Sequence, residues 1–288
     1  MTAVLPDPAL AGARPSARTP SPRRYLMCPP THFAVEYAIN PWMVPGTPVD
    51  RARATSQWDA LRRTYLDLGH RVDIVDPVPG LPDMVYAANG ATVVGGTVLG
   101  ARFRHPQRAA EAAAYAGWFR RAAFRRVVEP EFVNEGEGDL LVVGAGPEAT
   151  ILAGYGFRTE PRAHVEAARV LGCEVVGLEL VDPRYYHLDT AVAVLDATTI
   201  AWLPEAFTPA SQAVVRERFP EAVVADPADA AVLGLNAVSD GRHVVLPAPA
   251  TRLAAALAER GFVPVPVDLS ELRKGGGGPK CCTLEVRS

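Results

Sequence analysis

The sequence near its C-terminus places two cysteines directly after a glycine-rich loop. Four consecutive glycines are followed by Pro279, Lys280, Cys281 and Cys282. Such a run lets the backbone approach a ligand closely or adopt positive φ, so it can bring Cys281 to a binding site as a nucleophile. It is not a phosphate-binding loop, because Pro279 lacks an amide N–H and Lys280 precedes Cys rather than Ser or Thr. The alternative is a flexible linker to a frayed tail, which the strand-like residues 283–286 argue against.

A second segment combines an imidazole with a carboxylate. His187 and Asp189 are separated by one residue and stand just before an apolar stretch. In an extended chain, residues two apart point to the same side, so both side chains would face one pocket. A histidine beside a carboxylate is suited to general acid–base catalysis. Pairs of this kind are also common as structural hydrogen bonds, so the motif alone leaves both interpretations open.

Two further segments are rich in carboxylate and amide groups. Glu135, Glu137 and Asp139 alternate with glycines ahead of four apolar residues, which suits either a cation-binding rim or a plain acidic turn. Asp83 and Asn89 enclose a short apolar segment that ends at a glycine, and a β-turn is the alternative to a binding role there. Neither segment specifies a function by itself.

The composition is that of an ordinary soluble globular protein. The chain has 288 residues, of which 49% are apolar and 21% charged, and a net charge of −3. This charge gives no sign of a nucleic-acid-binding or membrane-binding face, and no apolar run approaches the ~20 residues needed to span a bilayer. We therefore expect a small-molecule substrate and neither a nucleic-acid nor a membrane partner. A homo-oligomer is compatible with the sequence but is not specified by it.

The sequence contains none of the common metal or cofactor motifs. Paired Cys or His residues at zinc spacing, an EF-hand loop and a dinucleotide-binding glycine motif are all absent. We expect no metal and no cofactor. The four cysteines Cys28, Cys173, Cys281 and Cys282 are too few for a disulfide framework at this length. Because there is also no apolar signal segment, the cytoplasm is the expected location.

Five copies of one structural unit follow one another along the chain. Each predicted amphipathic helix is followed at once by a short β-rich run. These runs begin ~40 to 55 residues apart, which is the range of repeat architectures. The predicted helices cover about 49–69, 106–121, 161–172, 209–219 and 250–261, and the strands that follow them cover 71–75, 126–129, 173–178, 221–225 and 262–267.

A unit of strand, hairpin, helix and strand cannot bury its own apolar face. Five units arranged round an axis could do so and would leave a pocket at the centre. We predict this ring rather than a doubly wound α/β sheet, in which the even spacing would be accidental. Residues 1–24 are Pro-rich and are expected to form a disordered tail, with 25–288 as a single catalytic domain. The predicted hairpins pair 91–94 with 98–101, 190–195 with 199–203, and 232–238 with 243–246.

Taken together, these segments resemble the guanidino-group-modifying enzymes, which include arginine deiminases, dimethylarginine dimethylaminohydrolases, arginine dihydrolases and glycine amidinotransferases. The resemblance extends over nearly everything after Arg24, and the order and spacing of the motifs around Glu135, His187 and Cys281 carry it. It implies the pentein fold, a five-bladed, pseudo-fivefold α/β propeller around a central active-site pocket. That fold agrees with the five units counted along the chain.

The resemblance also implies roles for individual residues. Cys281 falls on the nucleophile and His187 on the general acid and base, with Glu135 as the carboxylate that orients the histidine or the substrate. Cys282 is a rival nucleophile, but in an extended segment only one of the two thiols can face the pocket, and Cys281 directly follows the loop. The residues implied in substrate binding are Asp189 for the guanidinium, Arg102 and Arg158 for the α-carboxylate, Asp83 near the amino end, and Asn89 and Asp139 beside them.

Asn89 bears on the choice of substrate. Deiminases and dimethylarginine hydrolases carry an aspartate where this chain has Asn89, whereas arginine dihydrolases resemble it there and in the segments around Cys28 and Asn40. We therefore expect a hydrolase that cleaves guanidino C–N bonds through a covalent Cys281-amidino intermediate, as arginine dihydrolases do, giving ornithine and ammonia. The alternatives are a dimethylarginine dimethylaminohydrolase giving citrulline and dimethylamine, or an amidinotransferase. A catalytically inactive binding module is the non-enzymatic alternative.

Overall fold

The strands of the computed structural model, which describes residues 18–287, form five small sheets. Every sheet has three strands, and its middle strand pairs antiparallel with one neighbour and parallel with the other. The sheets are β15–β1–β2 (Leu284–Glu285, Arg24–Met27 and Arg71–Ile74), β3–β4–β5 (Ala91–Val94, Thr97–Gly100 and Arg126–Val128), β6–β7–β8 (Leu140–Val143, Thr150–Tyr155 and Glu174–Glu179), β9–β10–β11 (Val192–Val194, Ile200–Trp202 and Val223–Val224) and β12–β13–β14 (Val238–Ser239, His243–Pro247 and Val263–Val267).

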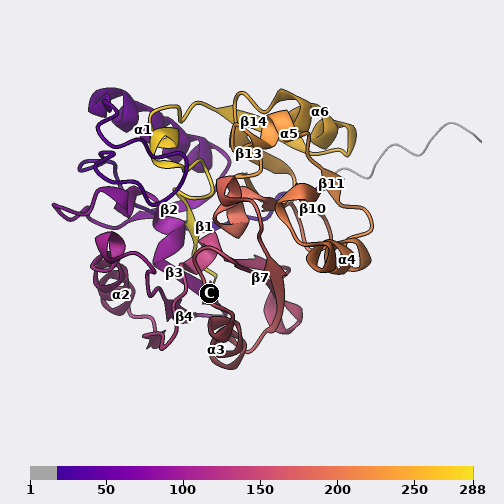
Figure 1. The fold of residues 1–288 in the computed structure, drawn as a ribbon, viewed down its shortest axis with the longest axis horizontal. Helices are drawn as coiled ribbons and strands as arrows, with labels where there is room; N and C mark the ends of the chain where they lie inside the picture. The colour runs from indigo at the N-terminus through magenta and orange to yellow at the C-terminus, as the bar shows by residue number, and fades with distance from the viewer. Residues whose placement is uncertain (1–17, 288) are drawn as a thin grey trace, which may run out of the picture.

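One helix joins the middle strand of each sheet to its parallel partner. Parallel strands need a crossover connection, which the helix supplies. In Figure 1 these helices follow one another round the outside of the molecule in chain order, with strands nearer the middle. No helix within residues 18–287 is long and apolar enough to cross a membrane. The crossover helices are α1 (Arg51–Asp67), α2 (Glu111–Arg121), α3 (Pro161–Leu171), α4 (Pro209–Arg218) and α6 (Thr251–Glu259), and a short α5 (Pro227–Ala230) precedes β12.

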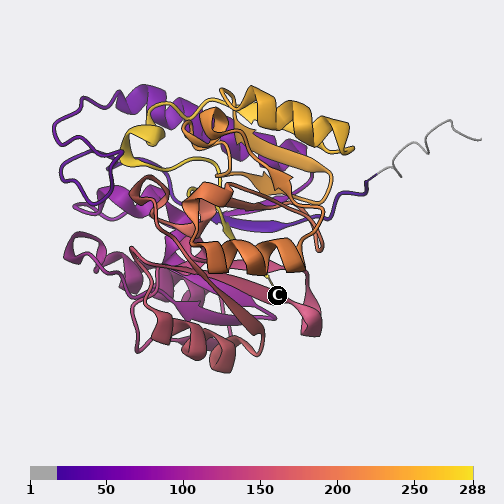
Figure 2. The same cartoon turned by 45° about the vertical axis from the view of Figure 1, so that its right-hand side comes forward.

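The two ends of the described chain close the ring. β15 pairs antiparallel with β1, with Glu285 opposite Tyr25 and Leu284 opposite Leu26. This pairing takes the place of the hairpin that the other four sheets contain, but its two strands are far apart in sequence. The yellow C-terminal strand β15 accordingly runs beside β1 near the start of the described chain (Figures 1 and 2). The predicted pseudo-fivefold α/β propeller is confirmed.

Local signals explain where several helices begin and end. The Asp50 side chain accepts a hydrogen bond from Arg53 N at the start of α1, and Thr208 accepts one from Ser211 N at the start of α4. Both are N-caps, which satisfy a backbone N–H that has no partner within the helix. Gly172 ends α3 with a φ of +72°, a conformation that costs glycine little.

Each helix buries an apolar face against the sheets. In α1, Ala54, Trp58, Leu61 and Tyr65 recur at helical spacing and are buried. They belong to one apolar cluster with Met27 of β1. Complete burial of a large apolar side chain stabilises the fold by roughly 1.5–3 kcal/mol. This packing holds the strands, and hence the residues that precede them, in fixed positions.

The predicted hairpin strand 232–238 is the clearest difference from expectation. Only Val238–Ser239 is strand, and the residues before it form turns. Leu233 has a φ of +61°, and a Cβ added to Gly234 would lie 2.7 Å from the Asp229 carbonyl oxygen. The chain turns too tightly here to pair with β13, although the apolar composition is typical of a strand. This part of the prediction was wrong.

Part of the expected disordered tail lies against the body of the protein. Residues 1–17 lie outside the described residues. Residues 18–23, which the prediction included in the tail, lead directly into β1. The Arg18 guanidinium stacks 3.5 Å from the centre of the Phe262 ring and forms an ion pair with Asp196. These contacts fix residues whose composition alone predicted no packing.

Truncation of Leu284 tests the closure of the ring. Leu284 is fully buried and packs in the apolar cluster that contains Met84 and Tyr115. Leu284→Ala would leave a cavity, which should lower the free energy of unfolding by roughly 2–5 kcal/mol in urea denaturation followed by circular dichroism. Val165→Ala, at an exposed position of α3, is the control and should have little effect. Equal losses for the two variants would contradict a closing role for β15.

Candidate active site

Residues that stand just before the first strand of several sheets meet in one buried group. Asn89 and Asn236 stand two residues before β3 and β12, and Asp189 and Cys281 stand three residues before β9 and β15. In each of these units, the segment just before the strand contributes a polar side chain to the site, although the units are far apart in sequence. Together with two further residues they form what we call the polar cluster: Asn89, Glu135, His187, Asp189, Asn236 and Cys281.

Cys281 lies inside the polar cluster with 1% of its surface exposed. Its thiol donates a hydrogen bond to Asp189 Oδ2 (3.3 Å), and Asn236 Nδ2 donates to the same sulfur (3.0 Å). Burial, together with the nearby Asp189 carboxylate, raises the pKa of the Cys281 thiol well above its usual value. The free protein therefore holds Cys281 as a neutral thiol, and its ionisation requires a group that offsets the charge of Asp189.

His187 is hydrogen-bonded to a carboxylate from a neighbouring unit. Its Nε2 lies 2.7 Å from Glu135 Oε2, and Arg158 Nη1 donates to the same oxygen at 2.7 Å. Burial alone would raise the Glu135 pKa, but the Arg158 guanidinium and His187 outweigh it and hold that pKa well below its ordinary value. Glu135 is thus an ionised carboxylate that fixes the imidazole ring.

Three buried polar atoms at the site have no hydrogen-bond partner among the described residues: Asp83 Oδ1, His187 Nδ1 and Asp189 Oδ1. Buried polar atoms are rarely left unpaired, so each marks a position suited to a ligand group. Burial raises the pKa of Asp189 to about 6, although His187 and Lys280 oppose the shift. It also raises the pKa of Asp83, against the effect of Arg108. Carboxylates accept N–H donors, which guanidinium and ammonium groups supply.

Asp139 is expected beside the substrate, but the backbone uses both of its oxygens. Oδ1 accepts from Leu188 N (3.0 Å) and Oδ2 from Thr159 N (3.2 Å). Leu188 stands between His187 and Asp189, so Asp139 fixes the loop that carries both of these side chains. It positions that loop rather than offering a free carboxylate to a ligand, and the three carboxylates around residue 137 form no common cation-binding rim.

A charged network that the sequence prediction missed surrounds Asn89. Arg108 is buried, and its Nη1 donates to Asn89 Oδ1 (2.8 Å). Its Nε and Nη2 donate to the Glu111 carboxylate (3.0 and 2.8 Å). Asn89 Nδ2 in turn donates to the Glu135 carbonyl oxygen (3.2 Å). The amide oxygen of Asn89 and one of its N–H groups are therefore already engaged within the protein.

Arg102, predicted to bind the substrate's α-carboxylate, lies outside the site. It is exposed, and its Nη1 donates to the Glu131 carbonyl oxygen (3.0 Å). Arg108 is the arginine from this segment that enters the site. The segment also contains Arg104, so the sequence pattern could not choose among three arginines. One available signal was Glu111, three residues after Arg108, because side chains at this spacing pair on a helical turn.

Arg158 and Asp83, predicted to bind the two ends of the substrate, are both buried at the site. Arg158 Nη2 donates to the Ile39 carbonyl oxygen (2.7 Å), and its guanidinium lies over the Tyr186 ring (4.7 Å). Asp83 Oδ2 accepts a hydrogen bond from Tyr37 (2.9 Å). The segment that contains Tyr37 and Ile39 therefore borders the site, next to the residues around Asn40 that carry part of the family resemblance.

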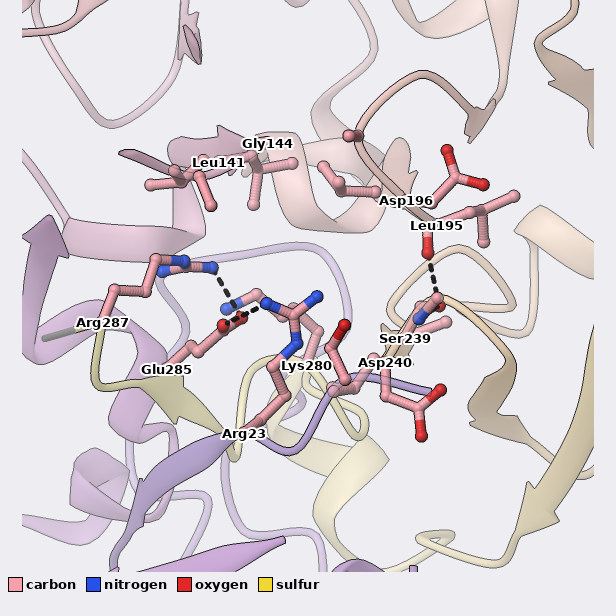
Figure 3. Close-up of a pocket in the computed structure, with 18 of the residues that line it drawn as sticks. Arg23, Leu141, Gly144, Leu195, Asp196, Ser239, Asp240, Lys280, Glu285 and Arg287 are labelled. Carbon is pink, nitrogen blue, oxygen red and sulfur yellow. Dashed lines mark hydrogen bonds and ion pairs between the residues drawn. The ribbon is translucent and has the colours of Figure 1, made fainter. Parts of the chain in front are cut away.

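A cavity of about 430 Å³ is lined by Lys280, Glu285 and Arg287, among other residues (Figure 3). Cys281, the residue after Lys280, does not line this cavity. Lys280 Nζ donates to Glu137 (2.8 Å), which also pairs with Arg287. Burial would raise the Glu137 pKa, but Arg287 and Lys280 lower it below its ordinary value. Glu137 therefore holds the loop that carries Cys281 in place through ion pairs with Lys280 and Arg287.

The polar cluster contains the parts that nucleophilic catalysis requires. The Cys281 thiol, the His187 imidazole and the Glu135 carboxylate come from segments that precede strands of three different sheets. Asn236 is a member that the prediction did not include, because it lies in the segment 232–238 that was predicted to be a strand. Within residues 18–287, no group of three or more His, Cys, Asp or Glu side chains is arranged to hold a metal ion.

The chain forms an α/β propeller around a buried cysteine, histidine and glutamate, and known proteins resemble it throughout its length. No family model matches it. A dimethylarginine dimethylaminohydrolase of Mycobacterium tuberculosis is 56% identical over 98% of this chain and 93% of the relative. The bifunctional arginine dihydrolase/ornithine cyclodeaminase ArgZ of Synechocystis is 38% identical over 91% of this chain, which spans 37% of that relative.

Solved structures support the same relationship. The N-terminal domain of ArgZ, an arginine dihydrolase, bound to product has a TM-score of 0.87 at 36% identity, over 93% of this chain and 98% of that one. A dimethylarginine dimethylaminohydrolase from Pseudomonas aeruginosa, 18% identical over 92% of this chain and 99% of that one, shares the fold with a TM-score of 0.75. The chain belongs to the guanidino-group-modifying enzymes. It is a hydrolase that acts on guanidino C–N bonds, as predicted.

The state of the thiols predicts how they react with alkylating agents. Because the Cys281 thiol is protonated in the free protein, iodoacetamide should label it slowly at neutral pH. The cation 2-chloroacetamidine can pair with Asp189 and should label Cys281 ~10-fold faster or more. Mass spectrometry of digested protein measures both rates, with Cys281→Ser as the control that removes the label and Cys282→Ser as the one that keeps it. Preferential labelling of Cys282 would contradict the assignment.

The raised pKa of Asp189 predicts an acid limit to activity. A carboxyl group with a pKa of about 6 is protonated at a higher pH than an ordinary aspartate. Once protonated, it no longer attracts a guanidinium cation, so kcat/KM should fall as the pH drops through about 6. A pH profile of kcat/KM for a guanidino substrate measures this effect. A profile that stays flat down to the pKa of an ordinary aspartate would show that Asp189 does not bind the cation.

Proposed function

We propose that this chain hydrolyses N-methylated arginine, releasing dimethylamine from dimethylarginine and leaving citrulline. The observation that carries the proposal is the 56% identity over 98% of the chain to a protein named dimethylarginine dimethylaminohydrolase. Proteins named as arginine dihydrolases are more distant, at 38% and 36% identity. From the sequence, Asn89 favoured arginine dihydrolase activity, and dimethylarginine hydrolysis was the alternative. The higher identity to the dimethylarginine hydrolase now favours that alternative.

The hydrogen-bonding capacity of the site supports this choice. Arginine carries five guanidinium N–H donors, whereas a terminal nitrogen with two methyl groups carries none, which leaves three. Asp189 offers the free carboxylate oxygen beside the sulfur. On the Asn89 side, the amide oxygen already accepts a hydrogen bond from Arg108, which leaves it one lone pair for a ligand. A dimethylated nitrogen needs no acceptor there, whereas the corresponding N–H groups of arginine would need two.

Binding would use the unpaired atoms of the site. Asp189 would hold the guanidinium with its carbon over the Cys281 sulfur, and Asp83 Oδ1 would accept from the α-ammonium group. Arg158 remains the arginine proposed for the α-carboxylate, since Arg102 is exposed. The guanidinium charge offsets Asp189, which lowers the cost of ionising the Cys281 thiol.

The first chemical step would form a covalent intermediate. The Cys281 thiol gives its proton to His187, the thiolate attacks the guanidinium carbon, and a C–S bond forms. His187 passes that proton to the methylated nitrogen, the C–N bond breaks, neutral dimethylamine departs, and the positive charge stays on the amidino group. The substrate carbon remains on sulfur as an amidino group that carries one NH₂ and the arginine Nε. Glu135 would hold the His187 ring in place throughout.

The second step would consume one water molecule. His187, now neutral, removes a proton from water, and the oxygen attacks the amidino carbon. The C–S bond breaks, the carbon keeps the water oxygen as a ureido carbonyl, and Cys281 regains its proton. Citrulline leaves, and the second proton of the water is released and taken up by dimethylamine, which then carries the positive charge that the substrate brought. All atoms of dimethylarginine and water are thereby accounted for.

Arginine dihydrolase activity is the second candidate, and Asn89 is the observation that favours it. With Asp189 as the one carboxylate beside Cys281, the site is less acidic there than a site with two would be. An uncharged ureido group could therefore bind again after a first round on arginine. A second round would convert citrulline into ornithine, carbon dioxide and ammonia.

Product analysis distinguishes the two candidates. Purified protein should convert dimethylarginine into citrulline and dimethylamine, identified by mass spectrometry. Arginine should react with lower kcat/KM, because unpaired buried N–H groups cost about 1–3 kcal/mol, which corresponds to roughly 10- to 100-fold. Cys281→Ser controls for contaminating activity. Ornithine formed from arginine, with dimethylarginine left unchanged, would replace the proposal by the second candidate.

A further inference from the structure

Asn236 is a buried asparagine whose side chain bonds entirely outside its own sheet. Oδ1 accepts from the main-chain N–H groups of Gly278 and Cys281, both at 3.0 Å. Nδ2 donates to the Asp189 carbonyl oxygen (3.1 Å) and to Cys281 Sγ (3.0 Å). One side chain therefore connects three of the five units and touches the reacting sulfur.

The partners of Asn236 determine the orientation of its amide. The two backbone N–H groups can only donate, so the amide oxygen must face Gly278 and Cys281. The NH₂ group must then face the sulfur and the Asp189 carbonyl oxygen, which can accept. A reversed amide would set donor against donor at both N–H groups, so the network itself assigns the N–H to the sulfur.

The Cys281 sulfur lies between two groups with opposite effects on its ionisation. Asp189 accepts the S–H bond and, as an anion, opposes a negative charge on sulfur. Asn236 donates to the sulfur and favours that charge. A guanidinium bound to Asp189 would offset the carboxylate. Asn236 would then remain as a fixed donor directed at the thiolate.

The backbone that leads to Asn236 is held in an uncommon conformation. Leu233, three residues earlier, is one of two non-glycine residues in the described part of the chain with positive φ, at +61°. Gly234 packs so closely that an added Cβ would lie 2.8 Å from the Ala250 Cβ. Conformations of this kind persist where the surrounding structure requires a particular placement. In this case, the turn positions the Asn236 side chain so that its NH₂ group donates to the Cys281 sulfur.

We propose that Asn236 is a further catalytic residue, whose side-chain N–H stabilises the Cys281 thiolate as it attacks and again when the C–S bond breaks. The inference rests on the proposed role of Cys281 as nucleophile, and it applies to either candidate substrate. In the absence of this donor, the Gly278 main-chain N–H would be the remaining hydrogen-bond donor that favours a charge on the sulfur, against the Asp189 carboxylate.

Two substitutions separate donation to sulfur from support of the loop. Asn236→Ala removes every side-chain contact, whereas Asn236→Asp keeps an acceptor oxygen for Gly278 and Cys281 but replaces the N–H donor with a carboxyl group, whose charge when ionised also disfavours the thiolate. Both should lower kcat by roughly 10- to 100-fold with little change in KM, and should shift the pH dependence of inactivation by 2-chloroacetamidine upward by about one to two pH units. Restoration of rate and pH profile by Asn236→Asp would reduce Asn236 to a structural link and overturn the proposal.

Gln57→Ala is a matched control for the loss of a buried amide. Gln57 also joins distant segments, through Asp268 and Glu271, but it has no contact with the polar cluster. It should lower the unfolding temperature without moving the pH profile. If Asn236→Ala does not fold, the isosteric Asn236→Asp carries the test, because an unchanged pH profile in that variant is sufficient to refute the inference.

Failure of this inference is distinguishable from failure of the proposed function. Turnover retained in Cys281→Ser would remove the nucleophile itself and with it the proposed function. An inactive Cys281→Ser, combined with unchanged inactivation rates and pH profile in Asn236→Asp, would leave the function standing and refute only the role of Asn236.

Discussion

A buried sulfur beside a carboxylate is the arrangement on which the rest of the site depends. Cys281 donates to Asp189 in surroundings that water does not reach, so the thiol keeps its proton until a cation offsets the carboxylate. As the proposed nucleophile, Cys281 would thereby respond to the charge of the molecule that enters. A molecule without a cationic group would not offset Asp189, so burial would favour a cationic substrate and would protect the sulfur from unintended oxidation.

Fivefold repetition allows a site to be polar and buried at once. Each polar segment of the site precedes a strand of a different unit. Side chains such as Asn89, Asp189 and Cys281 therefore bond to residues of neighbouring units. An unpaired buried polar group costs about 1–3 kcal/mol, and most polar atoms at the site are paired within the protein. The unpaired oxygens and nitrogen of Asp83, His187 and Asp189 are the exceptions, and they are concentrated where a ligand would bind.

Much of the fold could be predicted from sequence because its signals are local. Helices with N-caps such as Asp50 recur at even spacing, and the ring follows from the need to bury their apolar faces. The polar cluster was predictable only in part. The motifs around Glu135, His187 and Cys281 are distinctive in sequence, whereas Arg108 stands among similar arginines. Asn236 lies in an apolar segment that is typical of a strand, and only long-range packing shows that it turns toward the sulfur.

The sheet β15–β1–β2 joins the two ends of the described chain, and this affects when Cys281 is positioned during folding. The strands that hold Cys281 in place, β1 and β15, pair residues about 260 positions apart in the chain. Contacts between such distant segments form slowly, because the entropy of closing the intervening loop opposes them. A chain that has folded its other four sheets but not this one has its histidine and carboxylates but no positioned nucleophile. We therefore expect Cys281 to reach its place beside Asp189 late in folding, after contacts between segments that are closer in sequence.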